Sequence, residues 1–229
     1  MCTVCGCSPR TLENKHLIKV EQDILNQNNQ QAAKNRNYLN AQGVFSLNLV
    51  SSPGAGKTSL LEHTIRELKP EIDFFVIEGD QQTERDAERI RASGAQAYQI
   101  NTAKVCHLDA AMIDQAIHQL NPNNNAILFI ENVGNLVCPA AFDLGENLTV
   151  AMLSVTEGDD KPLKYPDIFY AADIVIISKT DLLPYVDFDI ESCKHYLKRI
   201  KQQQPVITLS VKTGEGLEDW YTLLKQRRL

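Results

Sequence analysis

The sequence lacks several features that define particular classes of protein. No apolar run approaches the roughly 18 residues that a membrane-spanning helix needs. The first ten residues, MCTVCGCSPR, contain no basic segment followed by an apolar one, so we expect no secretory signal. Basic residues are outnumbered, with 23 Lys and Arg against 29 Asp and Glu, and nothing resembles the clustered positive charge of a nucleic-acid-binding protein. We therefore expect a cytoplasmic protein whose partners include neither a membrane nor a nucleic acid.

The six cysteines are few and unevenly distributed. Cys2, Cys5 and Cys7 all lie in the first seven residues. They are too close together for disulfides among them to cross-link a domain. Because we expect no secretory signal, we also expect a reducing compartment, in which thiols stay free. Clustered cysteines in such a protein more often bind metal or carry out chemistry.

The chain of 229 residues is long enough for one large domain, and a hydrophobic content of 43% allows a buried core. Residues 1–10 form a Cys-rich head. In residues 11–43 the apolar positions first have helical spacing. The Asn- and Gln-rich stretch that follows either continues the helix weakly or forms a flexible tether. In residues 44–229, apolar strands alternate with amphipathic helices.

The alternation in residues 44–229 predicts the fold class. Stretches such as AILFIENV and DIVIIS are almost continuously apolar, which is typical of strands covered on both faces. The pattern indicates an α/β fold with a doubly wound, mostly parallel sheet of about seven strands and helices on both faces. We expect strands at 45–50, 73–78, 97–100, 126–133, 148–155, 173–178 and 205–210, and helices near 57–69, 84–93, 107–120, 190–202 and 216–227.

The stretch SSPGAGKTSL, residues 51–60, lies between an expected strand and an expected helix, as the phosphate-binding loop does in P-loop NTPases. Its glycines let backbone N–H groups turn toward a β-phosphate, and the helix adds its positive N-terminal end. Lys57 can reach the β- and γ-phosphates, and the Thr58 hydroxyl can bind Mg²⁺. Ser51 stands where the usual pattern has its first Gly, at the start of the turn. We predict that the phosphates bind at Gly54, Ala55, Gly56, Lys57, Thr58 and Ser59.

The stretch ISKTDL, residues 177–182, resembles the NKxD motif with which GTPases read guanine. The Asp181 carboxylate can accept hydrogen bonds from the N1–H and the N2 amino group of guanine, whereas adenine offers neither donor. Lys179 can lay its aliphatic stem along the base. The Asn of the motif is replaced by Ser178, whose shorter side chain can make fewer contacts, so we expect guanine preference with looser binding.

The stretch SVKTGEG, residues 210–216, is similar to the loop that supports the base from the other side in GTPases. We therefore add Ser210 and Lys212 to the expected nucleotide-binding residues.

Two further strand ends carry acidic residues. Glu131 ends an apolar run and Gly134 follows it, which is the placement of a Walker B acid and a DxxG-like switch. Glu131 can hold Mg²⁺ directly or through water, and Gly134 can sense the γ-phosphate. Asp80 and Asp86 are candidates for binding the metal or orienting the attacking water, although either acid could instead cap a helix or be a solvated charge. We assign Mg²⁺ to Thr58, Asp80 and Glu131, and catalysis to Lys57, Asp80, Asp86 and Glu131.

Cys106 and His107 are adjacent at the expected start of a helix, and Cys138 lies four residues after Gly134. A helix N-terminus lowers the pKa of a thiol and favours the thiolate that metals need. Two thiols and an imidazole suit Zn²⁺ or Ni²⁺. The alternative is that the two cysteines are ordinary core residues.

The Cys-rich head has the pattern C-x₂-C-x-C. Three thiolates from Cys2, Cys5 and Cys7, together with the terminal amine, can make a four-coordinate site. This ligand set suits square-planar Ni²⁺ better than a tetrahedral zinc shell. The alternative is a flexible tail that oxidises easily.

The remaining cysteine and three of the histidines receive structural interpretations. Cys193 shares an apolar helix face with Leu197, so we expect it in the core. His63, His118 and His195 lie on polar faces of expected helices, and we expect them to be solvated.

Taken in order, MCTVCGC, SSPGAGKT, VIEGDQQT, VCHLDA, ENVGNLVCP, TEGDDKPLKYP and SKTDL make essentially the whole chain resemble the HypB family, the nickel-incorporation GTPases of hydrogenase maturation. The resemblance implies slow hydrolysis of GTP to GDP and a homodimer that forms with GTP. It implies Ni²⁺ or Zn²⁺ at Cys106, His107 and Cys138, and tightly held Ni²⁺ at the head. The implied partners are a hydrogenase maturation protein and the hydrogenase large subunit. The polyhistidine stretch of some relatives is absent, which argues against bulk nickel storage.

The ligand count leads to a hypothesis for the mechanism. Cys106, His107 and Cys138 are too few to close a tetrahedral shell, so two subunits can share the metal across a two-fold axis. Because Cys138 is close to Gly134 in the chain, the γ-phosphate and the metal can bias the same segment, and this coupling must be reciprocal. Hydrolysis would then weaken or release the metal.

Other functions are consistent with parts of the pattern. A urease nickel GTPase would share the architecture, but we expect a Cys-Pro-His arrangement there and no Cys-rich head. The same head argues against the GTPase chaperones of cobalamin enzymes. In a nickel- or zinc-sequestration protein, GTP hydrolysis would be incidental, and removal of residues 1–10 would lower the storage of metal. A purely regulatory GTPase would leave five of the six cysteines without a role.

Overall fold

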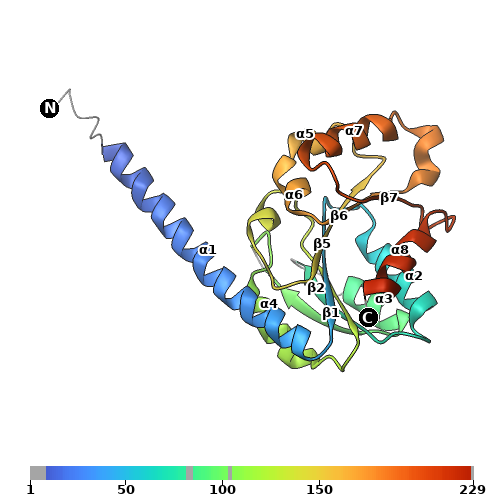
Figure 1. Ribbon diagram of the computed structural model, residues 1–229, viewed down its shortest axis with the longest axis horizontal. Helices are drawn as coiled ribbons and strands as arrows, with labels where there is room; N and C mark the ends of the chain where they lie inside the picture. The colour runs from blue at the N-terminus through green and yellow to red at the C-terminus, as the bar shows by residue number, and fades with distance from the viewer. Residues whose placement is uncertain (1–8, 81–84, 103–104, 228–229) are drawn as a thin grey trace.

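The computed structural model describes residues 9–80, 85–102 and 105–227. Seven strands form a single sheet in the order β3-β2-β4-β1-β5-β6-β7, and all neighbouring strands in it are parallel. The predicted fold class and strand number are confirmed (Figure 1). The strands are β1 (Phe45–Ser51), β2 (Phe74–Asp80), β3 (Gln96–Asn101), β4 (Ile127–Glu131), β5 (Leu148–Ser154), β6 (Ile174–Ser178) and β7 (Val206–Thr208).

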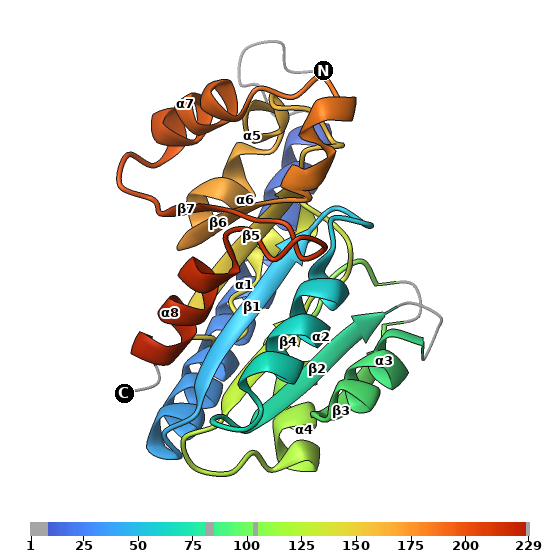
Figure 2. The ribbon, with the colours of Figure 1, turned by 90° about the vertical axis from the view of Figure 1, so that its right-hand side faces the viewer.

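Helices cover both faces of the sheet (Figure 2). The longer ones are α1 (Pro9–Ala41), α2 (Lys57–Leu68), α3 (Arg85–Ser93), α4 (Ala110–Leu120), α7 (Ile190–Ile200) and α8 (Leu217–Arg227). Four short helices were not predicted from the sequence: α5 (Lys161–Lys164), α6 (Pro166–Ala171), and the 3₁₀ helices η1 (Cys138–Ala141) and η2 (Thr180–Tyr185).

Successive strand residues point to opposite faces, so the sheet separates two hydrophobic layers. Ile176, for example, joins the layer under α2 and α8, whereas Ile177 joins the layer under α6 and α7. Trp220 of α8 is fully buried in the first layer, and its Nε1–H donates to Thr64 Oγ1 at 2.9 Å. A third cluster packs α1 and α4 against β2 and β4. Both faces of the sheet are therefore covered, as the continuously apolar strands predicted.

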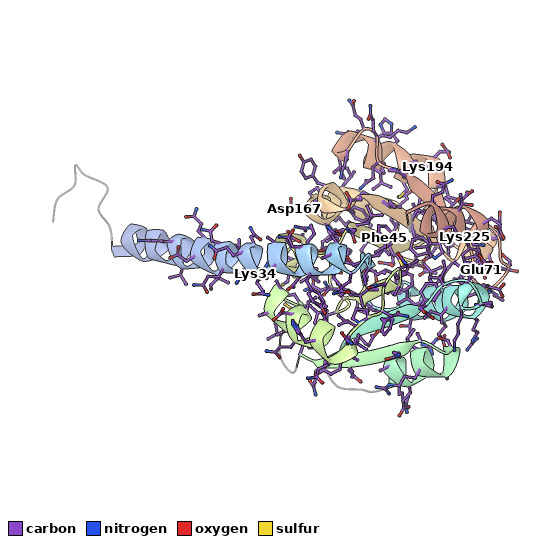
Figure 3. The ribbon with its side chains drawn as sticks, turned by 60° about the horizontal axis from the view of Figure 1, so that its bottom comes forward. Lys34, Phe45, Glu71, Asp167, Lys194 and Lys225 are labelled. Atoms are coloured by element: carbon purple, nitrogen blue, oxygen red, sulfur yellow. The ribbon has the colours of Figure 1, made fainter. Side chains whose placement is uncertain are left out.

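The helix α1 takes the helical alternative for residues 11–43 and has two unlike halves. In its C-terminal half, Asn28, Ala32, Asn35 and Leu39 are buried. Their spacing of four, three and four residues puts them on one face of a helix. Farther toward the N-terminus the helix projects away from the sheet (Figure 3), and Val20 is 42% exposed there. From Asn28 onward, α1 is thus packed onto the rest of the fold.

The carboxyl ends of parallel strands meet at one edge of the sheet, which is where ligands bind in open α/β folds. Ser51 ends β1, Glu131 ends β4 and Ser178 ends β6. This edge therefore collects the residues that the sequence singled out, although they are far apart along the chain. Within the described ranges, no helix is both long enough and apolar enough to cross a bilayer.

Candidate functional site

The phosphate loop connects β1 to α2 as predicted. Gly56 precedes the first residue of α2 and has φ 103°, a conformation that favours glycine. The loop and the first turn of α2 line a pocket of about 470 Å³, which also contains the ends of β2 and β4. The N–H groups of a first helical turn have no partners within the helix, so this end of α2 is suited to bind an anion. Members of the predicted set that line the pocket are Gly54, Gly56, Lys57, Thr58, Ser59, Asp86, Glu131, Gly134 and Lys179.

Ser51, the departure from the usual loop pattern, contacts the lysine of the loop. The Lys57 ammonium donates to Ser51 Oγ at 3.0 Å, and Ser51 Oγ donates to the Ser52 carbonyl at 2.6 Å. Ser51 is fully buried, whereas a glycine at this position would offer no side-chain acceptor. The serine thus holds Lys57 within the loop.

Glu131 and Thr58 lie side by side at the floor of the pocket. Thr58 Oγ1 donates to Glu131 Oε1 at 2.7 Å, and Glu131 is only 4% exposed. Burial raises the pKa of the Glu131 carboxyl, while Lys57 and Thr58 act in the opposite direction. A hydroxyl beside a carboxylate offers the hard oxygen ligands that Mg²⁺ takes in nucleotide sites. The donor set thus fits the predicted ion.

Glu78 is a second buried acid in the pocket, and the sequence analysis missed it. It lies on β2 directly opposite Glu131 of β4, and both acids are buried, with Glu78 only 3% exposed. Burial, reinforced by the charge of Glu131, raises the pKa of Glu78 to about 11. Burial favours the neutral form of a carboxyl, and a neighbouring acid favours it further. The only sequence signal was an acid inside an apolar strand, VIEGD, two residues before the one that we chose.

The other two predicted acids are Asp80 and Asp86, and the structure describes the side chain of Asp86 alone. Asp80 is the last residue of β2, at the edge that carries the pocket, but its side chain lies outside the described structure. Asp86 lines the pocket from the first turn of α3 and is half-buried. Its Oδ1 accepts from Arg89 Nη1 at 2.9 Å, and Arg89 also binds Glu62 at 2.6 Å. Asp86 and Glu62 therefore share Arg89 as an ion-pair partner on the wall of the pocket.

The predicted base-reading residues gather in a second pocket of about 470 Å³ that adjoins the first. Ser210 Oγ donates to Asp181 Oδ1 at 2.6 Å, and Lys212 Nζ lies 3.9 Å from Asp181 Oδ2. Lys179 Nζ donates to the Gly54 carbonyl of the phosphate loop at 2.6 Å. Ala55 lines this pocket together with Lys179, Asp181 and Lys212. The two sequence motifs thus converge around one carboxylate, as a guanine site requires.

Ser178, which replaces the Asn of the base motif, bonds to the phosphate loop through its hydroxyl. It donates to the Ala55 carbonyl at 2.7 Å and lies 3.3 Å from the Leu153 carbonyl. The side chain is 3% exposed, so these bonds are shielded from water. A link between the base motif and the loop therefore remains despite the shorter side chain.

Gly134 lies against the phosphate loop. A Cβ atom at this position would be 2.9 Å from Pro53 Cγ and 3.0 Å from Pro53 Cα, so any side chain would force the two segments apart. The segment after β4 thus touches the loop that would hold the phosphates. This close approach is what a phosphate-sensing switch needs.

The thiol site is formed by Cys106, His107 and Cys138. Their ligand atoms all lie within 4.8 Å of one another, and the two Sγ atoms are 2.8 Å apart. The His107 ring stacks on Phe142, with ring centroids 4.0 Å apart. All three residues are half-buried, which contradicts the alternative that the cysteines are core residues. Two thiols and an imidazole converging in this way fit the soft or borderline ions predicted for them.

The electrostatics of the thiol site correct one prediction. Helix α4 begins at Ala110 with Asp109 as its N-cap, not at 107, so its N-terminus does not lie at Cys106. The pKa of Cys106 is raised rather than lowered, first because of its hydrogen bond with Cys138 and then because of burial. Burial also lowers the pKa of His107, which favours the neutral imidazole that binds metals.

Two asparagines connect the nucleotide pocket to the thiol site. Asn135 Nδ2 donates to the Cys106 carbonyl at 3.1 Å. Asn132, which lines the nucleotide pocket, accepts from the Leu108 N–H at 3.4 Å and from the Val133 N–H at 2.9 Å. The segment that follows β4 is therefore hydrogen-bonded to the segment that carries Cys106 and His107.

The remaining predictions have mixed outcomes. Cys193 is fully buried as expected, and burial raises its pKa to about 12. His118 and His195 are exposed as expected. The expectation for His63 was wrong: the ring is half-buried, and Nδ1 lies 2.8 Å from the Tyr221 hydroxyl. The head residues Cys2, Cys5 and Cys7 lie outside the described structure.

Comparison with known proteins defines the class of this fold and site. The model of the CobW/HypB/UreG nucleotide-binding domain matches residues 46–208, which is most of the sheet domain. Hydrogenase maturation factor HypB of Azotobacter vinelandii is 55% identical over 217 residues, which cover 95% of this chain and 72% of that protein. The chain belongs to the HypB family of hydrogenase maturation factors, and the predicted resemblance is confirmed.

Two solved structures support the same assignment. HypB from Helicobacter pylori, crystallised in complex with nickel, has a TM-score of 0.83 and 41% identity, covering 88% of this chain and 95% of that one. HypB from Archaeoglobus fulgidus also has a TM-score of 0.83 and 41% identity, covering 89% of this chain and 99% of that one. The matched nucleotide-binding domain, residues 46–208, contains the residues that line the nucleotide pocket and the three residues of the thiol site.

Proposed function

We propose that the chain is a slow GTPase in which the nucleotide controls a nickel ion delivered during hydrogenase maturation. The observation that carries this proposal is the continuity of residues 131–138. Glu131 and Gly134 line the nucleotide pocket, Asn135 bonds to the Cys106 carbonyl, and Cys138 belongs to the thiol site. One short segment therefore takes part in both sites. The nickel complex of the Helicobacter pylori relative favours nickel over Zn²⁺ as the cargo.

The roles in hydrolysis follow from the pocket. We assign Lys57 to the β- and γ-phosphates, and Asp86 and Asp80 to the attacking water. When bound through Thr58, Asp80 and Glu131, Mg²⁺ would neutralise negative charge on the phosphates. The Lys57 ammonium must leave Ser51 Oγ to reach them. Gly134, packed on Pro53, would move when a γ-phosphate arrives, because the two backbones are already in contact.

The coupling to nickel follows from that movement. A shift of Gly134 and Asn135 changes the bond from Asn135 to Cys106 and the position of Cys138. Three ligands leave an open coordination position, so we propose that a second copy completes the shell in a GTP-dependent homodimer. The head, with Cys2, Cys5 and Cys7, is proposed as a separate nickel site. The recipients would be a maturation partner and the hydrogenase large subunit, in the cytoplasm.

Nickel affinity measured in two nucleotide states tests the proposal. The Cys2, Cys5 and Cys7 triple serine variant removes binding at the head, so that the thiol site is titrated alone. With GDP and with a non-hydrolysable GTP analogue, we expect affinities that differ by about tenfold, a usual size for allosteric coupling. Sedimentation in the same samples should show dimers with the analogue and nickel. Equal affinities together with an unchanged oligomeric state would reject nucleotide control.

A further inference from the structure

The thiol site is carried by two connecting segments, and neither is part of a strand. Cys106 and His107 lie between β3 and α4, while Cys138 begins η1 after β4. The segment after η1 returns as Phe142, which stacks on His107. The separation of the two segments therefore decides how far the ligands stand apart. Metal binding tolerates little error in that separation, because ligand distances are fixed to a few tenths of an ångström.

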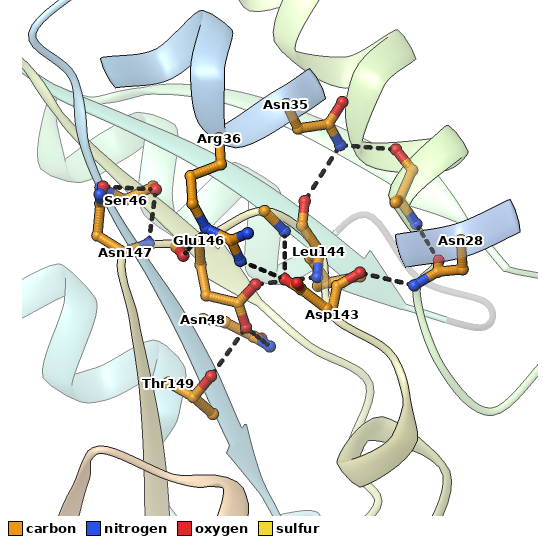
Figure 4. Close-up of polar contacts among 12 residues, drawn as sticks. Asn28, Asn35, Arg36, Ser46, Asn48, Asp143, Leu144, Glu146, Asn147 and Thr149 are labelled. Atoms are coloured by element: carbon orange, nitrogen blue, oxygen red, sulfur yellow. Dashed lines mark hydrogen bonds and ion pairs between the residues drawn. The ribbon is translucent and has the colours of Figure 1, made fainter. Parts of the chain in front are cut away.

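Two buried asparagines on α1 each bind both of these segments (Figure 4). Asn28 Oδ1 accepts from the Ala110 N–H at 2.9 Å, and its Nδ2 donates to the Asp143 carbonyl at 2.8 Å. Asn35 Nδ2 donates to the Ala110 carbonyl at 2.8 Å and to the Leu144 carbonyl at 3.1 Å. Ala110 follows His107 by three residues, and Asp143 follows Cys138 by five. Each amide thus spans the gap between the two ligand-bearing segments.

Helix α1 also packs closely against the segment that follows Cys138, at Gly145. A Cβ atom there would lie 2.4 Å from the Ala32 carbonyl oxygen and 2.7 Å from Asn35 Cβ, so only glycine allows this approach. Asn35 is itself oriented by Gln31, whose Nε2 donates to Asn35 Oδ1 at 3.0 Å. Arg36 adds an ion pair with Asp143 at 2.6 Å. The register of α1 against this segment is therefore fixed.

Packing alone does not explain these amides. Asn35 is 1% exposed and Asn28 is 8% exposed, and an apolar residue in such positions would contribute more to burial without needing partners. Buried amides instead fix the direction and distance of the groups to which they bond, because each unmade hydrogen bond in the interior is costly. The amides point at backbone groups on both segments, so what they fix is the spacing of those segments.

We propose that α1 is a working part of the thiol site, with Asn28 and Asn35 as positioning residues that set the distance of Cys106 and His107 from Cys138. Docking of α1 and binding of metal are then coupled, and each strengthens the other. The inference rests on the proposed metal site. It adds to that site a helix from outside the matched nucleotide-binding domain, which begins at residue 46. The residues that hold the ligands in place usually affect metal affinity by 10–100-fold.

Titration with Ni²⁺ alone tests whether Asn28 and Asn35 position the ligands. The background is the full chain with the three head cysteines replaced by serine, and the readouts are affinity and the Ni²⁺–thiolate charge-transfer absorption. We expect Asn28→Ala and Asn35→Ala each to weaken Ni²⁺ binding about tenfold and to change the absorption. Gln31→Ala, which only loses the bond that orients Asn35, is the gentler variant should the others fold poorly, with an expected weakening of about threefold.

The matched control is Asn40→Ala. Asn40 also lies on α1 and accepts from Asn147 at 2.9 Å, but it is exposed and contacts neither segment near the ligands. Its Ni²⁺ affinity and spectrum should stay at the background value. A general loss of stability would lower the melting temperature in all α1 variants alike without changing the charge-transfer spectrum of the bound form.

Hydrogen exchange provides the reciprocal measurement. Ni²⁺ should slow amide exchange in residues 28–40 of the background protein, and Cys138→Ala should remove this protection. The positioning role of α1 would be overturned if Ni²⁺ affinity and absorption stayed unchanged in Asn28→Ala, Asn35→Ala and Gln31→Ala. Absence of Cys138-dependent Ni²⁺ binding in the background protein would instead reject the proposed function, so the two failures are distinguishable.

Discussion

The nucleotide pocket and the thiol site lie next to each other but are held in place by different means. The pocket takes its side chains from the ends of strands and the start of a helix: Ser51 ends β1, Lys57 begins α2 and Glu131 ends β4. The thiol site takes its ligands from two irregular segments. Backbone hydrogen bonds of the sheet fix the first set, whereas side-chain amides such as Asn135 fix the second.

This difference indicates which site can move. Strand ends in the middle of a seven-stranded sheet are difficult to displace, because every neighbour is hydrogen-bonded. Segments held by a few hydrogen bonds from side-chain amides can shift when one of those hydrogen bonds changes. The pocket is thus the rigid partner and the thiol site the adjustable one. The following predictions test that contrast, from the largest expected effect to the smallest.

The replacement Lys57→Ala should separate the two sites most completely. Loss of the ammonium assigned to the β- and γ-phosphates should lower kcat/KM for GTP by about 10²–10³-fold. Nickel binding without nucleotide should stay within twofold, since Lys57 does not contact the thiol site. Phosphate release and metal titration provide the two measurements, and Lys69→Ala, at the end of α2, is the control.

Removal of one thiol tests the other side of the contrast. Cys138→Ala should weaken nickel binding at the thiol site by about 100-fold, because it removes one of three ligands. Nucleotide affinity should change less than twofold. Cys193→Ala is the matched control, since its thiol is buried in the core and should affect the melting temperature but not metal binding. A comparable nickel loss in both variants would contradict the assignment of Cys138.

Asn135→Ala probes the connection between the sites. It removes the hydrogen bond to the Cys106 carbonyl while leaving every proposed ligand in place. We expect the ratio of nickel affinities with GDP and GTP analogue to fall from about tenfold to near unity. Isothermal titration in both nucleotide states measures this ratio. If the ratio persists, the coupling runs through Asn132 or the backbone instead.

The acid pair predicts how stability depends on pH without Mg²⁺ or nucleotide. The pKa of Glu78 is raised to about 11, so the folded state holds a proton that the unfolded chain releases near pH 4.5. This contribution to stability is complete below pH 4.5 and is lost progressively as the pH rises toward 11. Glu78→Gln should therefore stabilise the chain by about 1 kcal/mol at pH 8 and by less at pH 5.

Thermal unfolding in EDTA at the two pH values checks this prediction. The control is Glu88→Gln, an exposed acid on α3 that does not line the pocket. It should shift the melting temperature little at either pH. Equal effects of the two substitutions would show that the Glu78 charge is not costly in the folded chain.

Ser51→Ala should have the smallest effect. It removes the acceptor of Lys57, so the lysine no longer has to leave a partner when phosphate binds. We expect GTP affinity to rise by about twofold, since one hydrogen bond is exchanged for solvent. Fluorescent nucleotide titration resolves such a change. Weaker binding would show instead that Ser51 helps to shape the loop.

The phosphate loop was predictable from the sequence because its residues are close together along the chain. Lys57 and Thr58 lie within one loop, and the strand and helix around it are marked by periodicity. Glu78 was missed because its importance depends on register. Only the pairing of β2 with β4 puts it opposite Glu131, and no local pattern reveals that pairing.

The thiol site was predictable in its ligands but not in its support. Residue type identified Cys106, His107 and Cys138, whereas Asn28 and Asn35 of α1 are more than 70 residues from their partners in these segments. The start of α4 was misplaced by three residues, although Asp109 is a good N-cap signal in HLDAAM. The Asn- and Gln-rich part of α1 looked weakly helical because its stability comes from tertiary contacts.

The length of α1 limits how an ion can pass between the two cysteine groups of one chain. From Pro9 to Asn28 the helix rises about 28 Å, at about 1.5 Å per residue. Cys7 precedes Pro9 by two residues, which extend no more than about 7 Å. While α1 stays straight, Pro9 therefore lies about 28 Å along the helix axis from Asn28, whose side chain bonds to Ala110. Direct passage of an ion from the start of α1 to the backbone at Ala110 within a single molecule would therefore require the helix to bend or unwind.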